Sequence, residues 1–151
     1  MSLIRRALPK EAEQLTQITI AAKRHWGYPE KWIQLWIPEL TFSPENIAEN
    51  EFWLAEVDEV IAAYYSLKQD VEGLWLDNLW VLPEYIGQGI GRRLFEHALV
   101  RGRAWGDSVL KIEADPNAQS FYEKMGAQSV GQHQYELDGK LRILPIMEIK
   151  L

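Results

Sequence analysis

The chain has 151 residues, a formal net charge of −6, no cysteine and three histidines, which fits one domain over residues 1–151 whose core needs no disulfide. The missing cysteines exclude thiolate zinc sites and a cysteine nucleophile, and the three scattered histidines show no metal-ligand spacing. The acidic balance argues against nucleic acid as a partner, and neither a membrane span nor a signal peptide is present, so we expect a cytoplasmic protein.

The first third of the chain predicts one strand followed by helices. In chain order these are a strand over 3–7, helices over 10–23 and 28–40, and a helix start at Ser43-Pro44-Glu45. Apolar residues recur at spacings of three and four in both longer helices. Pro29 and Pro38 are expected to bound the second helix. Ser43 is the expected N-cap of the third, with Pro44 at its first position.

The rest of the chain predicts a mixed sheet with helices on its faces. The elements are strands over 52–57, 60–68 and 74–82, a helix over 90–105, a strand over 109–114, a helix over 118–125, and strands over 129–137 and 142–151. Asp58-Glu59 and Asp138-Gly139 are expected hairpin turns. Pro145 should place the last strand at a sheet edge or in a bulge. No repeat or linker divides the chain.

A glycine-rich turn carries the first chemical signal. An apolar strand ends at Pro83, and the turn Gly87-Gln88-Gly89-Ile90-Gly91 then opens a helix, with the cationic Arg92 and Arg93 beside it. Glycines let backbone amides approach a ligand, and a helix N-terminus favours anions, so one interpretation is a pyrophosphate site. The other is a tight turn whose glycines serve geometry alone. A P-loop lacks its lysine here, and a Rossmann motif would need glycine where Arg92 stands.

A second segment, together with the first, points to a family. The stretches Leu76–Arg93 and Ile112–Ala127 resemble two motifs of the Gcn5-related N-acetyltransferase (GNAT) superfamily, its acyl-CoA pyrophosphate loop and its Asn–Phe-Tyr-Glu-Lys-x-Gly helix. The resemblance implies an α/β fold, with a mixed, mostly antiparallel sheet of six to seven strands flanked by about four helices. It also implies direct transfer of an acetyl group from acetyl-CoA to a primary amine of a small molecule or peptide.

The resemblance assigns cofactor contacts to individual positions. They are the strand residues Leu79, Trp80 and Val81 toward pantetheine, the amides of Gly87, Gln88, Gly89, Ile90, Gly91 and Arg92 toward the pyrophosphate, and Asn117 toward the cofactor arm. Asp115-Pro116 already supplies a helix cap, so the Asn117 amide is expected to stay free for the ligand. Ile86 stands where the family usually has Arg or Gln, which puts cofactor affinity in doubt unless Gln88 or the Arg92-Arg93 pair compensates.

The resemblance also proposes a catalytic acid, whereas the base stays open. Tyr122 matches the tyrosine that the family commonly uses to protonate the departing thiolate. Phe121 points about 100° away from it in a helix, so we expect Phe121 in the core and Tyr122 toward the cleft. Asp77 is the first candidate base and Glu113 a weaker one. A solvated or backbone-bonded Asp77, with a water chain as base, is the alternative.

Aromatic residues lie where the family forms its acceptor wall. Trp32 and Trp36 have the helical spacing of core residues, whereas Trp26 and Tyr28 flank a loop and face either the acceptor or the core. The acidic balance favours a cationic amine acceptor, and an exposed tryptophan-rich face would favour a homodimer. The alternative function is a non-catalytic acyl-CoA-binding sensor or regulatory module of the same fold.

Overall fold

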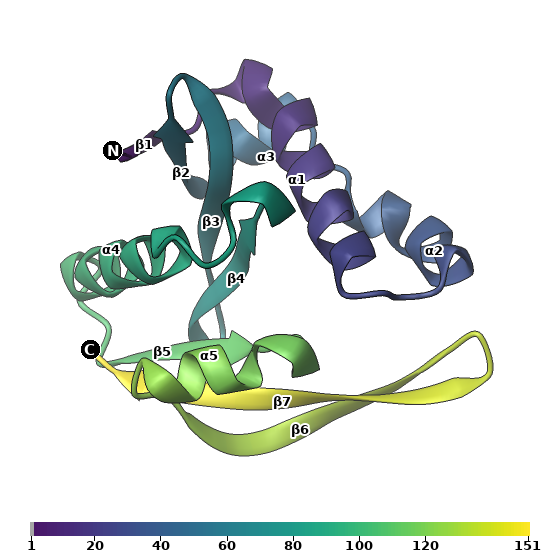
Figure 1. Cartoon of the computed structure of the whole chain (residues 1–151). Helices are drawn as coiled ribbons and strands as arrows, with labels where there is room; N and C mark the ends of the chain where they lie inside the picture. The colour runs from purple at the N-terminus through teal and green to yellow at the C-terminus, as the bar shows by residue number, and fades with distance from the viewer. Residues whose placement is uncertain (1) are drawn as a thin grey trace. The chain divides into compact units, whose positions relative to one another are not determined.

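The computed structural model describes residues 2–151 and contains the predicted elements in the predicted order (Figure 1). Its strands and α-helices are β1 Ser2–Arg6, α1 Ala12–His25, α2 Glu30–Leu40, α3 Pro44–Glu49, β2 Glu51–Val57, β3 Val60–Asp70, β4 Gly73–Val81, α4 Ile90–Ala104, β5 Val109–Glu113, α5 Gln119–Lys124, β6 Gln128–Leu137 and β7 Lys140–Lys150. Short 3-10 turns precede α1, α4 and α5 at Pro9–Glu11, Pro83–Tyr85 and Pro116–Ala118.

The seven strands form a mixed sheet, hydrogen-bonded in the order β1-β2-β3-β4-β5-β7-β6. The β4–β5 pair is parallel, whereas the β1–β2, β2–β3, β5–β7 and β6–β7 pairs are antiparallel. The prediction of an α/β fold with a mostly antiparallel sheet is therefore confirmed, with five α-helices where about four were expected. The chain forms two compact units. The first unit comprises Met1–Leu67 and Asn78–Glu96, and the second Lys68–Asp77 and His97–Leu151.

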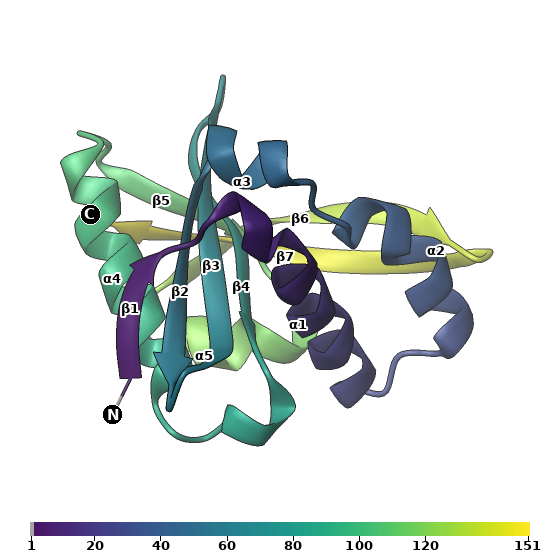
Figure 2. The same ribbon diagram turned by 90° about the horizontal axis from the view of Figure 1, so that it is seen from above.

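In the first unit, α1 and α3 lie along β2 and β3 and bury one apolar cluster (Figure 2). The cluster contains Ala7, Ala12, Leu15, Ile18, Ile47, Phe52, Leu54 and Tyr64. The rings of Phe52 and Tyr64 stack with centroids 6.2 Å apart, and Phe42 packs edge-on against both. Elsewhere in this unit the side chain of Arg5 bridges two carboxylates, Glu11 and Glu56, at 2.6 Å each. The hydrogen bonds from Arg5 lower the pKa of Glu11, so this buried carboxylate stays ionised.

One helix start and one helix end test the sequence rules in this unit. Ser43 caps α3 as predicted, because its side chain accepts a hydrogen bond from the Asn46 amide. The prediction that Pro38 ends α2 is wrong, since the helix continues to Leu40. Buried Trp36 anchors the helix one residue before its last turn, and a proline this near the end removes only one helical hydrogen bond.

In the second unit, β7 lies between β5 and β6, and β6 and β7 form a long twisted hairpin (Figure 1). Its turn is at Asp138-Gly139 as predicted, with positive φ at both residues, 53° and 74°. The prediction that Pro145 marks an edge or bulge is wrong. The Pro145 carbonyl accepts a hydrogen bond from the Ala114 amide, so the backbone of Pro145 faces the β5 side of β7. Because β5 ends at Glu113, no strand residue there requires the N–H that proline lacks.

Candidate functional site

The glycine-rich turn of the first unit presents backbone amides rather than side chains. Gly87 and Gly89 have φ values of +85° and +82°, a region in which a side chain is strained, and a Cβ at either position would meet no protein atom within 4 Å. The first α4 hydrogen bond runs from the Arg93 amide to the Gly89 carbonyl, at 3.1 Å. The amides of the three preceding residues therefore lie at the helix N-terminus without a carbonyl of their own helix. This arrangement suits an anion.

The polar side chains around this turn make contacts within the unit. Gln88 donates to the Glu84 carbonyl at 3.2 Å, Arg92 pairs with Glu96 at 3.0 Å, and Arg93 donates to the Ser2 carbonyl at 3.3 Å. Ile86, which stands where the family usually has a polar residue, is 43% exposed. The exposed Arg92–Glu96 pair is a weak surface contact, so the arginine can turn toward a ligand at little cost.

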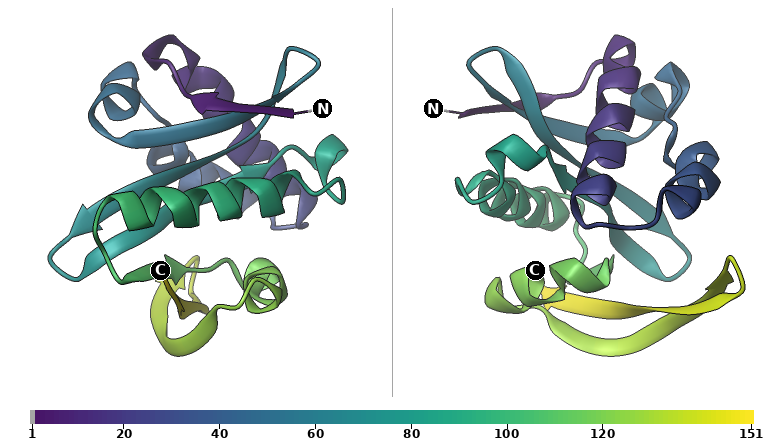
Figure 3. Two further views of the ribbon diagram at one scale, coloured as in Figure 1. Left: turned by 90° about the vertical axis from the view of Figure 1, so that its left-hand side faces the viewer. Right: turned by 45° about the vertical axis from the view of Figure 1, so that its right-hand side comes forward.

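The aromatic residues of the first unit surround a lysine. The Lys23 Nζ lies 4.2 Å from the ring centroid of Trp36, 4.9 Å from Trp80 and 5.5 Å from Tyr28. Trp36 is buried as predicted, whereas Trp32 is only half-buried and stacks on Tyr28 with centroids 6.0 Å apart. The prediction of Trp32 as a core residue is therefore wrong, since this half-buried ring shares one cluster with Tyr28, for which the sequence left both a core and an acceptor-facing position open. The right-hand view of Figure 3 shows the loop that joins α1 to α2 and carries Tyr28.

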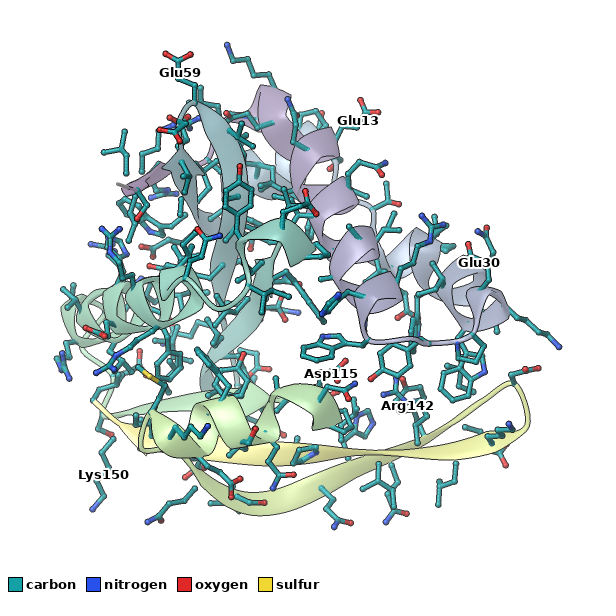
Figure 4. The ribbon with its side chains drawn as sticks, in the orientation of Figure 1. Glu13, Glu30, Glu59, Asp115, Arg142 and Lys150 are labelled. Atoms are coloured by element: carbon teal, nitrogen blue, oxygen red, sulfur yellow. The ribbon has the colours of Figure 1, made fainter. Side chains whose placement is uncertain are left out.

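Within the second unit, Asn117 begins the segment that leads to α5. Asp115, labelled in Figure 4, caps this turn as predicted by accepting from the Asn117 backbone amide at 2.9 Å. The same Oδ1 atom also accepts from the Asn117 side-chain amide at 3.0 Å. The expectation that this amide stays free is therefore wrong, because a cap two residues earlier is close enough to bind it as well.

Tyr122 is buried in α5, with 6% of its surface exposed, and Phe121 is the half-buried neighbour. The prediction that Phe121 takes the core is therefore wrong. Ala118, Tyr122 and Met125 recur at helical spacing and form the less exposed side of this short helix. Burial, with a smaller contribution from Asp115, raises the pKa of the Tyr122 hydroxyl. The Tyr122 hydroxyl is therefore protonated at neutral pH.

A cavity of about 670 Å³ lies on the face formed by the strands of the second unit. It is lined by Lys68, Asp70, Glu72, Trp75, Leu76, Asp77, Lys111, Glu113, Val130, Gln132, His133, Ile146 and Glu148. Both candidate bases, Asp77 and Glu113, line it, whereas Tyr122 and Asn117 do not. Partial loss of hydration raises the pKa of the Asp77 carboxyl, Lys68 opposes this effect and Glu113 adds to it.

His133 is a functional candidate that sequence reasoning missed. Its Nδ1 lies 3.1 Å from Glu113 Oε1 in the same cavity, and its ring stacks on Tyr135 with centroids 5.7 Å apart. Strand alternation could have placed His133 on one face of β6. Only the sheet order β5-β7-β6 brings this face to Glu113, two strands away.

Two absences hold for residues 2–151. No helix in this part of the chain combines the length and the apolar character that a bilayer crossing requires. The same residues contain no group of three or more acidic or histidine side chains arranged to bind a metal ion.

Comparison with known proteins identifies the family. Residues 13–127 match the model of the acetyltransferase (GNAT) family. The uncharacterized N-acetyltransferase YafP of Escherichia coli is 28% identical over 90% of this chain and 87% of its own length. The peptidyl-lysine N-acetyltransferase YjaB of Salmonella typhimurium is 32% identical over 62% of this chain.

For some relatives the match is partial. It spans 61% of YjaB and 56% of an uncharacterized N-acetyltransferase of Lactobacillus delbrueckii subsp. lactis that is 30% identical over 57% of this chain. Among solved structures, the PaiA N-acetyltransferase of Thermoplasma acidophilum in complex with coenzyme A has a TM-score of 0.81 at 24% identity, covering 100% of this chain and 99% of that one. The two motifs, the strand order and the family match agree, and the chain belongs to the acetyltransferase (GNAT) family.

Proposed function

We propose that the protein transfers the acetyl group of acetyl-CoA directly to a primary amine of a cationic small molecule or peptide. The observation that carries this proposal is the turn of Gly87–Gly91, where two glycines with positive φ open a helix whose first amides have no helical partner. In a GNAT-family chain such a turn suits the pyrophosphate of an acyl-CoA. The coenzyme A complex of the Thermoplasma acidophilum protein supports the choice of cofactor.

The cofactor contacts follow from the backbone. The amides from Gly87 to Arg92 would bind the pyrophosphate, and Leu79, Trp80 and Val81 on β4 would meet pantetheine through their main chain. Asn117 would contact the cofactor arm through its amide oxygen, since its amide nitrogen donates to Asp115. Ile86 offers the phosphates only an apolar side chain, so Arg92 and the amides would supply most of the affinity.

The chemistry needs one proton donor and a place for a charged acceptor. When the amine attacks the thioester carbonyl, a C–N bond forms and the C–S bond breaks, and the thiolate would take a proton from the Tyr122 hydroxyl. The raised pKa of Tyr122 keeps this proton available at neutral pH but makes the phenol a weak acid, so positioning would provide most of the benefit.

Asp77 is the carboxylate that we assign to the acceptor. The cavity that it lines carries five carboxylates, from Asp70, Glu72, Asp77, Glu113 and Glu148, against Lys68 and Lys111, which favours a cationic ligand. The named activity of YjaB on peptidyl-lysine supports an amine of this kind. With acetyl-CoA as donor, we place the reaction in the cytoplasm.

The experiment is an acyl-transfer assay on the purified protein. Acetyl-CoA is incubated with a panel of amines, from diamines and lysine peptides to neutral arylamines, and free thiol is followed with and without each amine. We expect amine-dependent thiol release that is fastest with cationic acceptors. Tight acetyl-CoA binding by calorimetry with no amine-dependent release across the panel would instead support the non-catalytic acyl-CoA sensor.

A further inference from the structure

One titratable side chain of the cavity, His133, has no role in the proposed reaction. The His133 ring and the Glu113 carboxylate are joined at 3.1 Å between Nδ1 and Oε1, and both line the cavity that contains Asp77. The two side chains are 52% and 41% exposed, so each also reaches solvent. A pair that faces both a cavity and bulk water can carry a proton from one to the other.

The sheet register explains why these groups meet. The parallel pairing of β4 and β5 ends at Leu76 and Ile112, so Asp77 and Glu113 are the first residues beyond it. Glu113 pairs with Ile146 of β7, and Ile146 pairs with Gly131 of β6, just past a bulge. The bulge shifts the register of β6, and two residues later His133 is on the same face as Gly131.

The contacts of His133 select one tautomer for the neutral ring. A carboxylate can only accept, so Glu113 places the ring hydrogen on Nδ1 and leaves the lone pair on Nε2. Stacking on Tyr135 fixes the plane of the ring, with 28° between the two planes. The Tyr135 hydroxyl in turn accepts from buried Arg142, which Figure 4 labels, at 3.1 Å. The ring is therefore oriented from two sides.

Acidic and basic side chains surround His133 in the cavity. The titratable groups of the cavity and of the stacked residues are Lys68, Asp70, Glu72, Asp77, Lys111, Glu113, Glu148, Tyr135 and Arg142. Carboxylates outnumber the cationic side chains in this set, and Glu113 is the one in contact with the imidazole.

We propose that His133, oriented by Glu113, is the general base that takes the proton of the acceptor amine. This inference rests on the proposed acetyl transfer. As the amine nitrogen bonds to the thioester carbon and the C–S bond breaks, the amine N–H proton passes to His133 Nε2. The thiolate takes the proton of the Tyr122 hydroxyl, and Tyr122 regains a proton from solvent. The imidazolium then releases its proton to solvent. Asp77 holds cationic acceptors, and Glu113 is a positioning residue.

The test uses an acceptor that carries no charge of its own. A neutral arylamine does not titrate in this pH range, so the pH dependence of kcat/KM reports groups of the enzyme. With a histidine as general base, kcat/KM should fall as the pH is lowered from about 8 to about 5, which we call the acid limb. We expect His133→Gln to lower kcat about 10²-fold and to remove this limb, with acetyl-CoA affinity and circular dichroism unchanged. Glu113→Gln should keep part of the rate, because the amide oxygen of a glutamine can still accept the Nδ1 hydrogen and orient the ring.

The controls separate the possible failures. His25→Gln makes the same change at an exposed helix end in the first unit and should leave both rate and limb intact. If His133→Gln keeps the wild-type rate and acid limb, the inference is overturned while the proposed function stands. Loss of the limb in Asp77→Asn instead would assign the base to Asp77 and also overturn it. A wild type without turnover would overturn both proposals.

Discussion

The glycine turn of the first unit and the cavity of the second unit are built in opposite ways. Over Gly87–Gly91 the functional groups are backbone amides, since three of the five residues are glycines, Ile90 is buried and Gln88 donates to the Glu84 carbonyl. In the cavity the functional groups are side chains from five strands, which include Asp77, Glu113 and His133. The turn can recognise only what every acyl-CoA shares, whereas the cavity can discriminate among acceptors.

The difference also separates what substitutions should do. A change in the turn alters backbone conformation or fills space, so it should act on cofactor affinity. A change in the cavity alters charge or proton affinity, so it should act on acceptor KM, on kcat and on pH dependence. The buried Tyr122 lies outside both regions and gives the strictest test of the chemical step.

The largest expected effect is that of Tyr122→Phe. Removing the hydroxyl removes the proposed proton donor, and we expect kcat to fall about 10²–10⁴-fold at saturating acetyl-CoA and acceptor. Acetyl-CoA affinity and folding should stay nearly unchanged, because only one hydroxyl group is removed. Tyr65→Phe, which removes the hydroxyl of another buried tyrosine, should show no loss of kcat. Equal kcat in wild type and Tyr122→Phe would remove Tyr122 from the mechanism.

The next effect belongs to Gly89→Val. A valine side chain would enter the space that we assign to the pyrophosphate, and we expect at least a tenfold weaker Kd for acetyl-CoA, about 1.4 kcal/mol, by calorimetry. Gly106→Val is the matched control, because Gly106 has a similar φ of +86° and an equally open Cβ position after α4. Both variants carry the same backbone strain. Equal loss of cofactor affinity in the two variants would contradict the assignment of the turn.

A smaller effect is expected for acceptor binding in Asp77→Asn. Loss of the carboxylate should raise KM for a diamine about fivefold, or ~1 kcal/mol, as for a partly solvated ion pair. KM for a neutral arylamine should not change, because such an acceptor has no ammonium group to bind. An equal rise for both acceptors would mean that Asp77 shapes the cavity without recognising charge.

The smallest effect is on stability. Because the pKa of Asp77 is raised in the native state, its ionised form disfavours folding, and Asp77→Asn should be slightly more stable than wild type at pH 7. The gain in stability is complete above the pKa that Asp77 has in the native state. It disappears as the pH falls below the pKa of about 3.9 in the unfolded state, because the Asp77 carboxyl is then protonated in both states. Urea unfolding at several pH values measures it. A variant less stable than wild type at pH 7 would contradict the desolvation argument.

Local patterns predicted most of the fold because each depends on near neighbours. Ser43-Pro44 specified a helix start, and Asp138-Gly139 a hairpin turn. Pro38 and Pro145 misled for the same reason, since each rule considers a single strand or helix. Burial of Trp36 stabilises α2, so the helix continues past Pro38. At Pro145 the backbone N–H is not needed, because the neighbouring strand β5 ends there.

The candidate site divides along the same line. The glycine turn could be predicted from the spacing of its glycines, because a site made of backbone amides needs residues without side chains, and the sequence shows these directly. The cavity could not, since His133 and Glu113 meet only through the sheet order and a bulge in β6. The burial of Tyr122 rather than Phe121 was equally hidden, because both residues occupy one short helix and periodicity alone does not choose between adjacent aromatics.

The central claim is that acetyl transfer to an amine occurs, and the most direct measurement counts both products of one reaction. Acetylated acceptor is quantified by mass spectrometry and free coenzyme A by thiol titration, for wild type and Tyr122→Phe in parallel. We expect one acetylated amine for each coenzyme A released by the wild type, and a proportional loss of both products in the variant. Thiol release without acetylated amine, or at a rate that does not depend on the amine, would contradict the account.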